Sequence, residues 1–101
     1  MPRQPNDPHM KFIYDLAELI QENYPKLACC PGPIGELVIQ SPNNQIIIGD
    51  INDEWGLDVN DDQGSYLHSK DSIPEDADWE TFKTWALTNI TNIFPKETIT
   101  Q

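Results

Sequence analysis

Apolar residues near the start of the chain recur at the spacing of an α-helix. They fall at i, i+3, i+4, i+7 and i+11 and therefore share one helical face: Ile13, Leu16, Ala17, Ile20 and Tyr24. Asp7-Pro8 supplies a helix start, because aspartate accepts a bond from a backbone N–H and the φ of proline suits the first helical position. Pro25 disfavours a helical conformation of the residue before it, so this helix should end near Asn23 or Tyr24.

A second helix is predicted near the end of the chain. Its apolar face repeats at helical spacing and consists of Trp79, Phe82, Ala86, Ile90 and Ile93. Asp76 or Asp78 is expected to cap its N-terminus, and Pro95 is expected to end it. Trp79 and Trp85 are six positions apart and so diverge by roughly 120° around a helix. We therefore expect Trp85 to be partly exposed and available as a contact.

Between these helices the pattern changes to short β-type runs. Four strands are predicted, at Glu36–Gln40, Gln45–Ile51, Glu54–Val59 and Ser65–Ser69. Glu54–Val59 alternates cleanly, which places Trp55, Leu57 and Val59 on one face and Glu54 and Asp58 on the other. Residues 26–35 and 70–78 are interpreted as connections. Because the links between the four strands are only two to five residues long, the strands should form an antiparallel meander.

The predicted order is therefore α-β-β-β-β-α, an α+β fold. An antiparallel sheet can leave one face in water, and two amphipathic helices can cover the other face. The chain of 101 residues is long enough for one domain, predicted over residues 8–95. Residues 1–7 are expected to form a flexible N-terminal arm, and residues 96–101 a frayed tail.

The net charge of the chain excludes some classes of binding partner. Seventeen acidic residues against six lysines and arginines give a net charge of −11, which argues against direct binding to nucleic acid or to an anionic membrane. The sequence has neither an apolar run of membrane-spanning length nor a secretory signal, so a cytoplasmic protein is expected. Two adjacent cysteines do not make a disulfide framework.

Most of this charge belongs to the middle of the chain. Residues 36–78 contain eleven acidic residues and a single cation, Lys70, for a net charge of −10. The predicted sheet and its loops should therefore present a negative surface, while the two helical segments are almost neutral. Crowding like charges costs stability by mutual repulsion, and a basic partner is one explanation for that cost.

Two other chemistries have weaker support in the sequence. The run from Asp58 to Gly64 has oxygen ligands at alternate positions, as calcium loops do, but its glycine and its twelfth position (Ser69) do not fit, and a β-turn is favoured. Cys29 and Cys30 form no redox or zinc motif, and only His9 or His68 could serve as their base. The sequence therefore assigns no catalytic residue, no metal ligand and no cofactor, and predicts a protein that is not an enzyme.

The leading hypothesis is an acidic binding or inhibitor protein. Its negative sheet-and-loop face (residues 50–78) would occlude a basic partner, a nuclease or a nucleic-acid-binding protein, as immunity, anti-defence and DNA-mimic proteins do. The partner-binding residues predicted from the sequence are Asp50, Asp53, Glu54, Asp58, Asp61, Asp62, Asp71, Glu75, Asp76 and Trp85.

Two alternatives remain open. One is an interaction or assembly module that forms homo- or hetero-oligomers through Trp85 and an edge of the sheet, at Glu36–Gln40 or Ser65–Ser69. The other is a calcium or small-ligand binder. The first predicts binding that hardly responds to salt, and the second predicts a calcium-dependent melting temperature.

Overall fold

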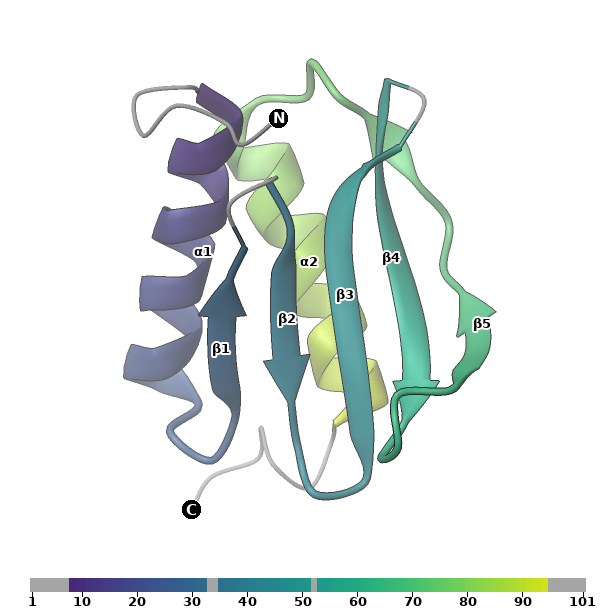
Figure 1. Cartoon of the computed structure of the whole chain (residues 1–101). Helices are drawn as coiled ribbons and strands as arrows, with labels where there is room; N and C mark the ends of the chain where they lie inside the picture. The colour runs from purple at the N-terminus through teal and green to yellow at the C-terminus, as the bar shows by residue number, and fades with distance from the viewer. Residues whose placement is uncertain (1–7, 33–34, 52, 95–101) are drawn as a thin grey trace.

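The protein folds as two helices against a six-stranded antiparallel sheet (Figure 1). The computed structural model describes residues 8–32, 35–51 and 53–94. The elements, in chain order, are α1 (Pro8–Asn23), β1 (Ala28–Pro31), β2 (Leu37–Gln40), β3 (Asn44–Ile51), β4 (Glu54–Asp61), β5 (Tyr66–Ser69), β6 (Ile73–Pro74) and α2 (Trp79–Ile93). The predicted α+β class is confirmed.

Both helices lie close to their predicted limits. The end of α1 at Asn23 is the one that Pro25 predicts. Helix α2 is capped by Asp78, whose side chain accepts a 2.9 Å bond from the backbone N–H of Thr81, and it ends before Phe94. The predicted Asp7 cap, the arm (1–7) and the tail (96–101) lie outside the described residues. Neither described helix is long and apolar enough to cross a membrane.

The sheet contains two strands more than the sequence predicts. Its order is β1-β2-β3-β4-β5, and β6 pairs with β4 beyond the end of β5. Strands β1 and β6 occupy the segments that were interpreted as connections, 26–35 and 70–78. Both are short and both end in proline, which edge positions of a sheet tolerate. As a consequence β2 is an interior strand, and the edges are β1 on one side and β5 with β6 on the other.

Both helices pack on the same face of the sheet. Figure 1 shows α2 behind the strands and α1 along β1. The strand alternation holds as predicted, since Trp55, Leu57 and Val59 are all buried. One core cluster joins the helices to the sheet, formed by Ile13, Leu16, Ala17, Ile20, Leu27, Leu37, Ile39, Ile46, Ile48, Trp55, Leu57, Val59, Phe82, Ala86, Ile90 and Phe94. No described helix or strand covers the other face of the sheet, which is called the open face below.

Candidate functional site

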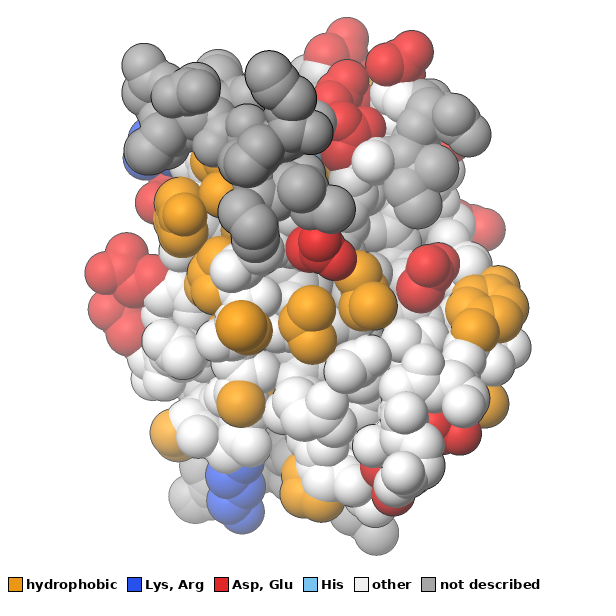
Figure 2. Space-filling view, viewed as in Figure 1, with side chains coloured by type: hydrophobic (Ala, Val, Ile, Leu, Met, Phe, Trp, Pro, Cys, Tyr) orange, Lys and Arg blue, Asp and Glu red, His pale blue; other side chains and the backbone are white. Residues whose placement is uncertain are grey.

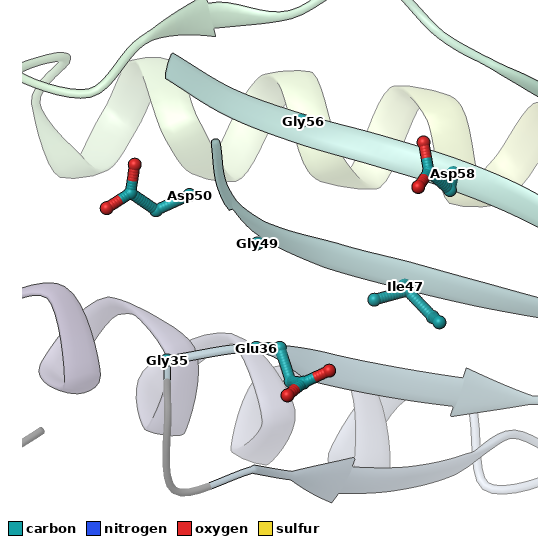
Figure 3. A pocket seen from close by; sticks show the side chains of 7 residues that line it. All are labelled: Gly35, Glu36, Ile47, Gly49, Asp50, Gly56 and Asp58. Carbon is teal, nitrogen blue, oxygen red and sulfur yellow. The ribbon is translucent and has the colours of Figure 1, made fainter. Parts of the chain in front are cut away.

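A hollow on the open face is the first candidate site (Figure 3). Gly49 of β3 and Gly56 of β4 are direct cross-strand partners, so two neighbouring positions lack side chains. The resulting space is about 170 Å³ and is lined by Gly35, Glu36, Ile47, Gly49, Asp50, Gly56 and Asp58. A Cβ on Gly49 would meet only Glu36, at 3.7 Å from its Cβ. The hollow exists because these two residues are glycines.

Carboxylates stand on two sides of this hollow. Glu36 directly precedes β2, and Asp58 projects from β4, with Ile47 of β3 between them (Figure 3). Asp58 accepts a 2.7 Å bond from the Ser69 hydroxyl, which fixes its orientation. Figure 3 shows the Asp50 carboxylate directed away from the other two. Two negative groups therefore flank an apolar floor.

The floor continues into an apolar strip. Val38 of β2 and Ile47 of β3 are paired in register on the open face, and both are half-buried. Figure 2 shows hydrophobic side chains in the middle of this face with acidic side chains around them. An apolar centre with a charged rim is the arrangement found at protein–protein interfaces.

Little positive charge offsets these acids. The lysine–carboxylate pairs of the described residues, Lys11–Asp15 and Lys83–Glu80, both lie on the helices. Asp50 and Glu75 both contact the His9 imidazole. The electrostatic field of the acids on the strands is thus left largely uncompensated within the described part of the chain.

A second cluster lies at one end of the sheet, on its helical side. His9 of α1 is buried between two carboxylates, with Nε2 3.6 Å from Asp50 Oδ2 and Nδ1 3.2 Å from Glu75 Oε2. Its ring stacks on Trp55, with 3.9 Å between the ring centroids. Asp50 points toward this cluster because it is the register partner of Trp55, which faces the core.

Several predicted partner-binding residues serve the fold as well. Asp53 occupies the β3–β4 turn with a positive φ of 66°. The exposed Glu54 accepts a 2.8 Å bond from the Ser72 hydroxyl. Asp71 contributes its backbone carbonyl, which accepts a 2.8 Å bond from the indole N–H of Trp85. Trp85 is half-buried, as expected, but Trp79 is half-buried as well, so exposure does not distinguish the two.

The segment from Asp58 to Gly64 forms a hairpin, as the turn interpretation predicts. Asp61 Oδ1 accepts backbone N–H bonds from Gln63 and Ser65, each 2.9 Å long, so this carboxylate organises the turn. Gly64 has a φ of 85°, which only glycine adopts without strain. Asp62 and Asp76 are exposed; Asp62 is at the tip of the hairpin, and Asp76 lies beside Glu75 in the turn before α2.

The cysteines differ in environment. Both are free thiols; Cys29 packs partly against the core, whereas Cys30 is exposed. Burial raises the pKa of the Cys29 thiol to about 11, so Cys29 stays protonated at neutral pH and is a poor nucleophile. Neither cysteine joins the cluster around His9.

Comparison of the chain with protein-family models, with curated proteins and with solved structures found no match. The function must therefore be argued from the geometry. Two residues central to that geometry, Glu36 and His9, are absent from the set of partner-binding residues predicted above. The glycines at 49 and 56 were the available sequence signal for the hollow, whereas nothing local links His9 to Asp50 and Glu75.

Proposed function

We propose that this chain is a non-enzymatic binding protein whose acidic sheet-and-loop face docks onto a basic protein and occludes it. The face comprises residues 50–78 and Glu36 beside them. The observation that carries the proposal is the net charge of −10 on residues 36–78, with Lys70 as the only cation of that segment. Such a field accelerates encounter with a basic surface and repels acidic proteins.

The partner chemistry follows from the charge. A surface that binds phosphates consists of lysines and arginines, and rows of carboxylates compete for those side chains. We therefore assign the partner to nucleases or other nucleic-acid-binding proteins, and the mode to inhibition of the immunity, anti-defence or DNA-mimic kind. Nucleic acid itself is not a ligand of this chain in the proposal.

The hollow gives this docking a specific contact. A lysine or arginine side chain can lay its aliphatic stem on Ile47 and carry its charged head to Glu36 or to Asp58. Each head group would pair with one of these carboxylates, since β2 and β4 lie about 10 Å apart across β3 and Asp58 is offset from Glu36 by two residues along the strands. The strip formed by Val38 and Ile47 would supply the apolar centre of the interface.

The test is a binding measurement with charge-reversed variants. The chain is immobilised and challenged with a panel of basic nucleases and DNA-binding proteins and with cell lysate, at low and at raised salt, with and without duplex DNA. The reversed variant changes Glu36, Asp58 and Asp62 to lysine. Asp61 is left unchanged because it organises its own turn.

A matched control reverses three exposed acids of the helices, Glu18, Glu22 and Glu80, and so changes the net charge equally. We expect capture that weakens steeply with salt, competes with DNA, and is lost in the face variant but kept in the helix variant. An equal loss of partner capture in both variants would mean that capture depends only on the net charge of the chain, and would refute binding through a defined face.

The β5 edge favours a second candidate, an assembly module. All four residues of β5 are exposed, and Tyr66 and Leu67 are 63% and 51% accessible. Leu67 is the extra residue of a bulge opposite Val59 and Asn60, and β5 ends the sheet. An open edge with apolar side chains can add a strand from a second chain. Size-exclusion chromatography with light scattering tests this candidate. A dimer that persists at raised salt and dissociates in the Leu67→Glu variant would favour assembly.

A further inference from the structure

A groove of about 510 Å³ runs between helix α1 and strand β1. Its helical wall includes Ala17, Glu18 and Glu22, and its other wall consists of Cys29 and Pro31 of β1. Strand β1 ends the sheet on this side, and Figure 1 shows α1 alongside it. The groove therefore follows an open edge of the sheet.

The outer edge of β1 carries backbone groups that no described strand uses. The Gly32 N–H donates a 2.7 Å bond to the Glu36 carbonyl, and bonded pairs recur at every second position of an antiparallel ladder. In the β1–β2 register, Ala28 and Cys30 therefore bond to β2. The N–H and C=O of Cys29, between them, point away from β2 and toward the groove.

Pro31 agrees with this assignment. It lies two positions after Cys29, so its nitrogen also points away from β2, where the missing N–H of proline costs no ladder bond. The carbonyl of Pro31 points outward as well. Unpaired N–H and C=O groups along a strand edge can pair with an extended segment from another chain.

The helical wall determines the charge of a suitable occupant. Glu18 and Glu22 are both exposed and lie four positions apart on α1, where like charges repel each other. Neither forms an ion pair within the described part of the chain, whereas Asp15 beside them pairs with Lys11. Lysine or arginine side chains in the groove would remove this repulsion.

The spacing of the two glutamates matches an extended segment. At 1.5 Å per residue, Glu18 and Glu22 are about 6 Å apart along the helix axis. Side chains on one face of a strand are about 6.6 Å apart. Basic residues at alternate positions of a strand beside β1 would therefore reach both carboxylates, with their aliphatic stems over Ala17.

We propose that this groove binds an extended basic segment of another protein, which adds to the edge of β1 as a further strand. The backbone of the segment pairs with Cys29, and its basic side chains pair with Glu18 and Glu22. An acidic segment would be repelled, and a helix would have no free backbone groups to offer. The inference goes beyond the proposed docking face, because the groove contains none of residues 36–78.

The probe is a short fluorescein-labelled peptide in which lysine alternates with valine. Its binding to the full chain is measured by fluorescence anisotropy. One control peptide has the same composition with all lysines adjacent, and a second is the alternating peptide methylated on its backbone nitrogens. We expect binding of the alternating peptide that is at least about threefold tighter than that of the first control, since only alternate lysines reach both glutamates. The methylated peptide, which cannot donate backbone bonds, should bind at least about tenfold more weakly.

Charge-reversed variants locate the binding site. Glu18→Lys combined with Glu22→Lys should weaken binding of the alternating peptide at least about tenfold at low salt, because two attractions become repulsions. The matched control, Asp58→Lys combined with Asp62→Lys, changes the net charge equally and should keep the peptide affinity within about threefold. An equal loss in both variants would mean that the peptide responds only to net charge, and would overturn the inference.

Amide hydrogen exchange tests the addition of a strand. In the free chain the Cys29 N–H should exchange faster than the Cys30 N–H, which is directed to β2. Saturating peptide should slow exchange at Cys29 at least about tenfold. Unchanged exchange at Cys29, equal binding of the methylated peptide, or no peptide binding at all would each overturn the inference. Peptide binding that persists in the Asp58 and Asp62 variant would support the groove as a site separate from the docking face.

Discussion

Filling the hollow on the open face should stabilise the protein while removing the proposed contact. In Gly49→Val, the new Cβ lies 3.7 Å from the Glu36 Cβ, an ordinary van der Waals distance, so the Cβ fits without displacing its neighbour and the methyl groups can extend into the hollow. Glycine inside a strand costs about 0.5–1 kcal/mol relative to alanine, and valine is among the best strand formers. The free energy of unfolding should therefore rise by about 0.5–1 kcal/mol.

The assay is urea unfolding followed by tryptophan fluorescence, to which the buried Trp55 contributes, together with melting curves. For a domain of this size the gain corresponds to a melting temperature raised by roughly 2–8 °C. Gly64→Ala is the matched contrast. Its Cβ also fits without a clash, with Gln45 Oε1 nearest at 3.9 Å, but the φ of 85° strains any residue other than glycine. We expect Gly64→Ala to lose about 1 kcal/mol.

Two results would refute this reasoning. A Gly49→Val variant that unfolds more easily than the parent would mean that the Gly49–Gly56 pair does not border an open space. A variant that is stabilised and still captures the basic partner with unchanged affinity would remove the hollow from the binding surface, because an isopropyl group there should block a lysine or arginine stem.

Three further predictions concern the thiols, a helix cap and the core. With its pKa raised to about 11 by burial, Cys29 should alkylate far more slowly at pH 8 than the exposed Cys30, so Cys29→Ser should leave the fast-reacting thiol and Cys30→Ser the slow one in a mass-spectrometric time course. The backbone N–H of Thr81, followed by its hydroxyl, holds the pKa of Asp78 below its ordinary value; stability from this cap is complete above the ordinary aspartate pKa and is lost as pH falls through the lowered one. The melting difference between Asp78→Ala and the parent should accordingly be full at pH 7 and shrink below about pH 4, and a difference independent of pH would contradict it. Leu57→Ala should lower the free energy of unfolding by about 2–5 kcal/mol in urea titrations, since Leu57 is 1% exposed in the core; a loss under 1 kcal/mol would mean that the site is not packed.

The helices and the central strands could be predicted from the sequence because their hydrophobic periods are local. The alternation of Trp55, Leu57 and Val59 by itself predicts the buried face of β4. Strand β1 could not be predicted, since its four residues end in Pro31 and sit in a segment rich in glycine and proline. It forms because β2 offers an unpaired edge, which is a tertiary effect.

For the candidate sites too, the sequence predicts some properties and the tertiary structure determines the others. The charge of residues 36–78 could be counted from the sequence, but the register decides which way each carboxylate points. Asp50 was grouped with the acids of the open face, yet its pairing with Trp55 turns it toward His9. The sequence predicts that Asp61 contacts a partner, whereas its side chain accepts hydrogen bonds from the backbone of its own turn. Neither result could be predicted from the spacing of residues along the sequence.

The most direct test of the central claim is the salt dependence of partner binding, measured by calorimetry for the parent chain and for the Glu36, Asp58 and Asp62 lysine variant. If a basic partner docks on this face, raising the salt from about 50 to 200 mM should weaken binding by about tenfold or more through screening. The lysine variant should then show no binding at either concentration. An affinity that is unchanged by salt and by the three reversals would contradict the proposed function.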